Sequence, residues 1–134
     1  MDDAERMRAV LGAQAAYYVG TGVVPFVSRR AFEAVTGPKR DWFLVQTIGG
    51  IVLVIGAALG SAAARERITP EITGLAAGSA AVLAAIDVWH VARGRIRPTY
   101  LLDAAVEAAL LSGLRRAPRP RRPARSGRAR GPSR

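Results

Sequence analysis

A run of 23 residues without a single charge, from Trp42 to Ala64, sets the strongest limit on how this chain folds. An α-helix rises about 1.5 Å per residue, so roughly 20 mostly apolar residues are needed to cross about 30 Å of hydrocarbon. Residues 9–28 form a second run, of 20 uncharged residues. Because lipid offers the backbone no hydrogen bonds, such segments cross as helices. The two runs therefore predict two membrane-spanning helices.

Two more segments are apolar but contain ionisable side chains. Residues 71–92 carry an aspartate and a histidine near their end, and residues 98–114 are shorter and carry two acids. We expect an all-α membrane protein with four transmembrane helices, at about 9–28, 42–64, 71–92 and 98–114, arranged as two antiparallel hairpins. Three spans with one surface helix are the alternative.

Local sequence predicts where the helices begin. Asp41 can cap the helix that follows it. Thr69 is followed by a proline and a glutamate, which combines an N-cap with a proline at the first helical position and an acid favoured by the helix dipole. Residues 97–99 (Arg-Pro-Thr) are expected to start the last helix in the same way. Residues 29–35 are predicted to form a short helix at the membrane surface.

The basic charge of the chain belongs to its last part. Residues 115–134 contain nine arginines, four prolines and no acid, whereas residues 1–114 contain eleven basic and ten acidic residues. Such a segment cannot bury a core, so we expect a disordered tail from Arg115 to Arg134. Its arginines are expected to attract anionic lipid headgroups. No folded nucleic-acid-binding module accompanies this charge, so nucleic acid is not an expected partner.

The charge distribution also predicts an orientation. With four spans, both termini and the 65–69 loop share one side, which carries thirteen arginines, and the other side carries seven basic residues. The positive-inside rule then places both termini in the cytoplasm. Without the tail the comparison becomes four against seven, so this orientation depends on the tail. Abundant Ala, Gly, Arg and Pro suggest a bacterial source, and hence a multi-pass protein of the cell inner (cytoplasmic) membrane.

Small and aromatic residues give two further expectations. Small residues recur at helical spacing, which favours close helix packing in lipid. These stripes are Gly12, Ala16 and Gly20; Gly56 and Gly60; and Gly74 and Gly78. The aromatic residues next to the 28–41 and 93–98 loops are expected to form a belt at one membrane face. They are Phe26, Trp42, Phe43, Trp89 and Tyr100.

Three acids lie within the predicted spans, where ionisable side chains are costly and usually face a protein interior or water. Asp103 and Glu107 are four residues apart and share a face of the last helix with Tyr100. Asp87 and His90 are three residues apart and share a face of the third helix. Because the loop joining the two helices is short, counting back from its centre puts Asp87 at nearly the depth of Asp103.

These residues suggest a polar pocket open toward the face of the 28–41 and 93–98 loops, with Gln46 and Tyr17 or Tyr18 lining it. Two acids at one depth tend to share a proton or recruit a cation. The candidate ligand- or proton-binding residues are Tyr17, Gln46, Asp87, His90, Tyr100, Asp103 and Glu107. The alternative interpretation is structural. In it, Asp87 and Asp103 pair with the arginines at 93, 95 and 97 and only position the helices.

Established catalytic patterns are missing from the sequence. It has no cysteine, and it contains no phosphate-binding glycine loop, nucleophile elbow or zinc-ligand pair. A single histidine beside one acid is weak evidence for a metal site. We therefore name no catalytic residue, metal site, cofactor-binding residue or cofactor, and we favour a protein that is not an enzyme.

Two motifs carry a family resemblance. Residues 32–39 (FEAVTGPK) lead into Trp42, and residues 98–103 (PTYLLD) precede Glu107. Together they resemble small, uncharacterised four-helix membrane proteins of bacteria and, more loosely, the DoxX-like group, whose members are linked to membrane redox partners. The resemblance covers residues 9–114, implies a four-helix membrane fold, and transfers no activity.

Three functional hypotheses follow. The first is a non-enzymatic structural or partner-binding membrane component, which could associate with further copies of itself or with another membrane protein. The second is a proton-coupled carrier or small-ligand-binding protein that uses the acidic pocket. The third is a membrane-embedded isomerase or oxidoreductase subunit that uses Asp87, His90 and Glu107.

Overall fold

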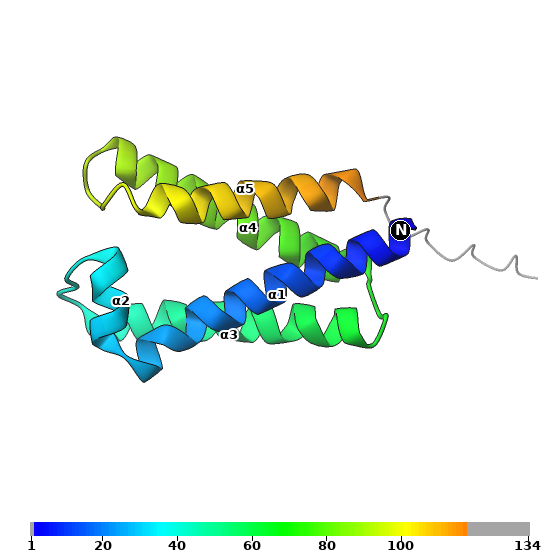
Figure 1. Cartoon of the computed structure of the whole chain (residues 1–134), viewed down its shortest axis with the longest axis horizontal. Helices are drawn as coiled ribbons and strands as arrows, with labels where there is room; N and C mark the ends of the chain where they lie inside the picture. The colour runs from blue at the N-terminus through cyan, green and yellow to red at the C-terminus, as the bar shows by residue number, and fades with distance from the viewer. Residues whose placement is uncertain (1, 118–134) are drawn as a thin grey trace, which may run out of the picture.

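The computed structural model describes residues 2–117, and this part of the chain folds into helices without any strand (Figure 1). The helices are α1 (Asp3–Val27), α2 (Arg29–Thr36), α3 (Trp42–Ala64), α4 (Pro70–Ala92) and α5 (Tyr100–Arg116). The all-helical fold expected from the sequence is confirmed. The prediction of a disordered tail is wrong for its first three residues, because Arg115 and Arg116 complete the last turn of α5 and Ala117 packs in the core. Residues 118–134 of that predicted tail lie outside the described residues.

Most helix starts follow the predicted caps. The Asp41 side chain accepts a hydrogen bond from the Leu44 N–H at 3.2 Å, and the Thr69 hydroxyl accepts one from the Ile72 N–H at 3.4 Å. The expectation for the last helix is wrong in one respect, because the Thr99 side chain caps nothing. Its hydroxyl donates to the Val35 carbonyl instead, at 3.1 Å, and so ties the start of α5 to the end of α2.

Three helices, α1, α3 and α4, are long and apolar enough to cross a membrane. At 17 residues α5 is shorter, and it carries two acids and two arginines. Many large apolar side chains of the bundle point outward, including Val54 on α3 and Val82 on α4. In water this outer surface would be a large unfavourable apolar area, whereas in lipid it is the expected exterior.

The helices pair as two hairpins, α1 with α3 and α4 with α5 (Figure 1). The α1–α3 pair is built on glycine. A β-carbon at Gly22 would lie 2.7 Å from the Gly49 carbonyl oxygen, and one at Gly56 would lie 2.8 Å from the Tyr18 β-carbon. These contacts bring the two backbones together as small residues allow in membrane proteins.

Only one of the three predicted small-residue stripes forms a helix contact. Gly56 and Gly60 face α1, where a β-carbon at Gly60 would lie 3.3 Å from the Ala15 β-carbon. The stripe from Gly12 to Gly20 does not pack closely on another helix, since β-carbons at both glycines would meet nothing within 4 Å. The same holds for the stripe at Gly74 and Gly78. The side of α1 that packs on α3 runs instead through Ala15 and Gly22.

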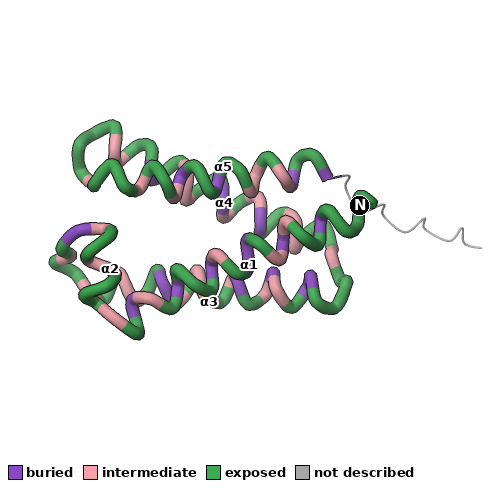
Figure 2. Tube along the Cα trace, in the orientation of Figure 1, coloured by how far each residue is buried: buried purple, intermediate pink, exposed green. Residues whose placement is uncertain are grey.

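The two hairpins meet around an apolar core at the end of the bundle that holds the N-terminus (Figures 1 and 2). All four long helices contribute to this core. Its buried residues are Met7, Leu11, Ala15, Leu59, Ala63, Ala76, Leu114 and Ala117. The opposite end, which we call the α2 end, carries α2, the loop at 37–41 and the loop at 93–99. The five aromatics expected to form a belt all lie in helix turns at this end.

Candidate functional site: a polar cluster between the hairpins

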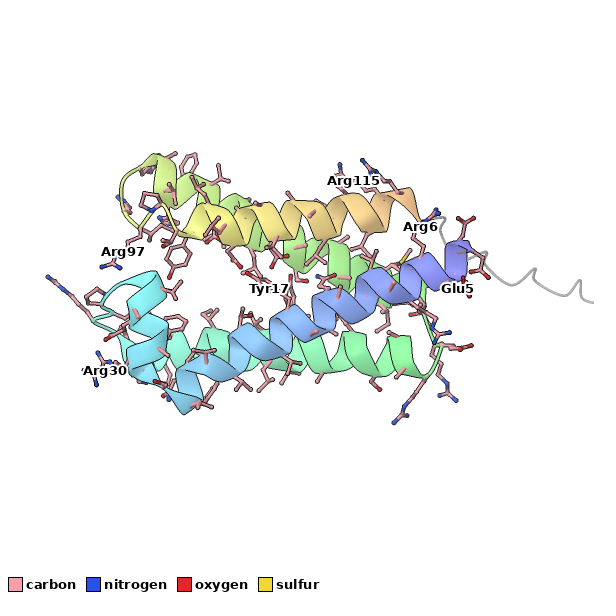
Figure 3. All side chains as sticks on the ribbon, in the orientation of Figure 1. Glu5, Arg6, Tyr17, Arg30, Arg97 and Arg115 are labelled. Carbon is pink, nitrogen blue, oxygen red and sulfur yellow. The ribbon has the colours of Figure 1, made fainter. Side chains whose placement is uncertain are left out.

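Polar side chains from three helices meet between the hairpins, on the α2 side of the apolar core. We call this group the polar cluster. It comprises Gln14, Tyr17 and Tyr18 of α1, Ser79 and Asp87 of α4, and Asp103 and Glu107 of α5. Figure 3 shows Tyr17 on the side of α1 that faces α5. Helical spacing explains the grouping on α1, because positions 14, 17 and 18 are three and four residues apart.

The innermost part of the cluster is the contact between Tyr18 and Glu107. Both side chains are completely buried. The Tyr18 hydroxyl donates to Glu107 Oε2 at 3.0 Å and also lies 3.3 Å from the Ser79 hydroxyl oxygen. The tyrosine therefore contacts both helices of the second hairpin, and a buried carboxyl receives a strong donor.

A second contact lies one helical turn closer to the α2 end. The Tyr17 hydroxyl donates to Asp103 Oδ1. The Asp103 carboxyl also interacts with the carboxyl of Asp87, which is 7% exposed. The prediction that these two acids lie at matching depth on neighbouring helices therefore agrees with the geometry.

Gln14 supplies the third contact between the hairpins. Its side-chain amide donates to the Ala76 carbonyl at 2.9 Å, and the side chain is completely buried. Ala76 lies three residues before Ser79, whose hydroxyl turns back to the carbonyls of α4. The polar contacts thus extend over about one turn of α1 and of α5 and about three turns of α4, and they border the apolar core.

Three buried oxygens of the cluster have no hydrogen-bond partner within residues 2–117. They are Gln14 Oε1, Asp87 Oδ2 and Glu107 Oε1. Unsatisfied buried oxygens are costly, because each has lost water without gaining a donor. A carboxyl that holds a proton, or a bound donor, would remove that cost.

Arginines do not neutralise the acids of the cluster in the described part of the chain. The interpretation that Asp87 and Asp103 pair with the arginines of the 93–98 loop does not hold there, since the ion pairs found are Arg6–Asp3, Arg8–Glu66 and Arg29–Glu33. Two of those arginines have other positions. Arg93 lies over the Trp89 ring at 4.0 Å, and a β-carbon at Gly37 would be 2.9 Å from Arg97 Nε.

The structure brings together four of the seven predicted site residues: Tyr17, Asp87, Asp103 and Glu107. The other three form no side-chain hydrogen bond with them within residues 2–117. Gln46 is on α3, which packs on α1. Tyr100 lies under the Lys39 ammonium, 5.1 Å from ring centroid to nitrogen, and His90 makes no side-chain hydrogen bond to Asp87 or Glu107.

Sequence reasoning did not assign Gln14 and Ser79 to the pocket. Gln14 had a detectable signal, because it precedes Tyr18 by four residues and is the most polar side chain of an apolar run. Ser79 precedes Asp87 by eight residues, a little over two helical turns, which puts both on one side of α4. Serine is common in membrane helices, so this spacing alone had little weight.

Comparisons of the chain with protein-family models, curated proteins and solved structures find no match. The chemistry of the cluster must therefore be judged from its own residues. Three carboxyls, two phenols, one hydroxyl and one amide can donate, accept and exchange protons. Within residues 2–117, His, Asp and Glu do not form a group of three arranged to hold a metal ion.

Proposed function

We propose that this protein is a small non-enzymatic membrane component in which a proton-holding polar cluster fixes one helical hairpin against the other. The hydrogen bond from Tyr18 to Glu107 carries this proposal, because it joins the hairpins through two completely buried side chains. The outward apolar faces of the helices would contact lipid, a membrane-protein partner or a second copy of this chain. In this role the acids orient helices and take no part in catalysis.

The proposal includes four spans. α5 pairs with α4 and its inward face carries Glu107, so its other faces meet the same surroundings as those of α4. Its two acids are turned toward α1, which lowers the cost of placing this short helix in the membrane. We expect the membrane to be the bacterial cytoplasmic membrane and the segment from Arg115 to Arg134 to contact anionic headgroups.

The composition of the cluster favours a bound proton. The carboxyls of Asp87 and Asp103 lie close enough for their charges to interact, and neighbouring carboxylates rarely both stay ionised without a cation. Such a cation would have to come from outside the cluster, whose own members are acids, phenols, a hydroxyl and an amide. We therefore expect the cluster to hold at least one carboxyl in its neutral form at neutral pH.

Infrared spectroscopy tests this expectation. The full chain in lipid vesicles at neutral pH should show the C=O absorption of a protonated carboxyl, and Asp103→Asn or Glu107→Gln should weaken it. Glu66→Gln is the matched control, because Glu66 is exposed and paired with Arg8 at 2.6 Å. If the native protein shows no such absorption, the cluster holds no proton and the proposal fails in that part.

A second candidate function is a proton-coupled carrier or small-ligand-binding protein. The unpartnered Asp87 Oδ2 and Glu107 Oε1 favour it, because a ligand with N–H or O–H donors would satisfy both oxygens. Extra density beside these oxygens in an experimental structure of the purified protein would support this candidate over the structural one.

Reporter fusions test the proposed orientation. With four spans and cytoplasmic termini, a reporter inserted at Gly37 should be active only if it works in the periplasm. A reporter fused after Arg134 should be active only if it works in the cytoplasm. The opposite pattern would reverse the orientation. If the reporters at Gly37 and after Arg134 were both active on the same side of the membrane, the result would contradict four spans.

A further inference from the structure

The α2 end carries an excess of positive charge, with seven basic residues against two acids. The basic residues are Arg29, Arg30, Lys39, Arg40, Arg93, Arg95 and Arg97, and the acids are Glu33 and Asp41. We call this group the cationic end surface. The Thr99–Val35 hydrogen bond and the stacking of Lys39 on Tyr100 join its two loops across the hairpins. Figure 3 shows Arg30 directed away from the helices at this end, whereas the Arg97 side chain lies against Gly37, at the end of α2.

Both acids of this surface are already engaged inside the protein. Glu33 Oε1 accepts hydrogen bonds from the Lys39 backbone N–H at 3.0 Å and from Arg29 Nε at 3.1 Å. These two donors, the backbone N–H first, lower the pKa of Glu33 and keep its carboxyl ionised. Asp41 caps α3 through the Leu44 N–H. Neither acid is free to neutralise the remaining arginines.

Three arginines of the surface have no partner in the described part of the chain. Arg30, Arg40 and Arg95 are exposed, and their side chains form no hydrogen bond, ion pair or ring contact there. At the opposite end, six described basic residues face five acids, and Arg6 and Arg8 are both paired with acids. The unbalanced charge of the described bundle is therefore concentrated at the α2 end.

The same end exposes large apolar side chains next to these cations. Phe43 is 74% exposed, Val35 62% and Trp89 56%. Aromatic rings at a membrane–water boundary place neighbouring cations at the level of the lipid phosphates. Arg93 over Trp89, at 4.0 Å, and Arg29 over Trp42, at 4.9 Å, show this pairing of ring and cation.

We propose that the cationic end surface binds the headgroups of anionic phospholipids, with Arg30, Arg40 and Arg95 as the main contacts. Their guanidinium groups offer several donors each and suit phosphate oxygens. This site lies at the opposite end of the bundle from Arg115 and Arg116, which end α5. It does not depend on the protonation of the polar cluster, so the two proposals can fail separately.

Tryptophan fluorescence tests the proposal at this end specifically, because Trp42 and Trp89 are the two tryptophans of the chain and both lie there. The full chain is reconstituted in phosphatidylcholine vesicles that contain one fifth phosphatidylglycerol. Two vesicle preparations are compared. In one the phosphatidylglycerol carries bromine quenchers near the glycerol, and in the other an equal share of the phosphatidylcholine carries them. We expect stronger quenching by the brominated anionic lipid, with an enrichment on the order of fivefold for each bound arginine.

Two triple variants of equal charge provide the control. Arg30→Gln, Arg40→Gln and Arg95→Gln together should remove the preference, so that both brominated lipids quench equally. Arg65→Gln, Arg67→Gln and Arg115→Gln together change the other end and should retain it. Equal quenching by the two lipids in the native protein would overturn the proposal, and so would the same loss of preference in both variants.

Discussion

Replacing Gly22 with alanine should lower the stability of the bundle by about 2–3 kcal/mol, the upper range for added atoms in a packed interior. The new methyl group would lie 2.7 Å from the Gly49 carbonyl oxygen and 2.8 Å from the Leu53 backbone nitrogen. Both are backbone atoms of α3, so no side-chain rotation relieves the clash. Either α1 moves away from α3 or their contact is lost. Thermal melting in detergent, followed by circular dichroism, measures the effect.

Gly20→Ala is the matched control on the same helix. A β-carbon at Gly20 would meet nothing within 4 Å, so this variant should melt at the native temperature or slightly above. Alanine favours a helix over glycine by up to about 1 kcal/mol, which explains the direction. If the two variants melted alike, the close packing of α1 on α3 would not determine stability.

Tyr18→Phe should cost about 1–2 kcal/mol, near the upper limit measured for hydrogen bonds between membrane helices. The change removes one hydroxyl and leaves Glu107, which is completely buried, without the donor that lies 3.0 Å from its Oε2. A buried oxygen without a donor bears its full desolvation cost. The same melting experiment measures the loss.

Tyr100→Phe is the matched control, because it also removes a tyrosine hydroxyl. The Tyr100 hydroxyl has no hydrogen bond within residues 2–117, so this variant should melt like the native protein. The double variant Tyr18→Phe with Glu107→Met should recover part of the loss, because removing both polar partners leaves no unsatisfied group. Losses that simply add in the double variant would contradict a direct coupling between the two residues.

The helices were predictable because their limits are set locally. The uncharged run from Trp42 to Ala64 coincides with α3, and Thr69 caps α4 as its sequence predicts. Thr99 shows where local rules stop. Its backbone angles are already helical, unlike those of an N-cap residue, and its hydroxyl donates to the Val35 carbonyl of a neighbouring helix, which its local sequence does not indicate.

The packing faces could not be predicted in the same way. Nearly every face of α1 and α4 carries alanine or glycine, so helical spacing alone cannot separate the face that meets a neighbour from one that meets lipid. Gly20 and Gly22 illustrate this. They are two residues apart, and only Gly22 faces α3. The decision depends on the partner helix, which local periodicity does not contain.

The sequence predicts how deep in the membrane the site residues lie, but it does not predict on which side of the bundle each of them lies. The short loop between α4 and α5 predicts that Asp87 and Asp103 lie at the same depth. The two helices run antiparallel, one ending and one beginning at this loop. Only its depth in the membrane indicates Gln46 as a pocket residue. Depth does not tell which side of a bundle a helix occupies, and α3 lies along α1 rather than against α5. Tyr18 was found as an alternative to Tyr17, and both contribute.

The contrast between the two kinds of helix contact has a mechanical consequence. Within the α1–α3 pair, backbone atoms meet backbone atoms, so sliding one helix along the other requires the whole pair to separate. Between the pairs, hydroxyls and carboxyls meet, and a tyrosine can exchange one oxygen for another with a small turn of its ring. The easiest large motion is therefore a rocking of two stiff units about the apolar core beside the N-terminus. In such a motion the α2 end travels furthest, so the Thr99–Val35 hydrogen bond, which joins the hairpins there, would have to break first.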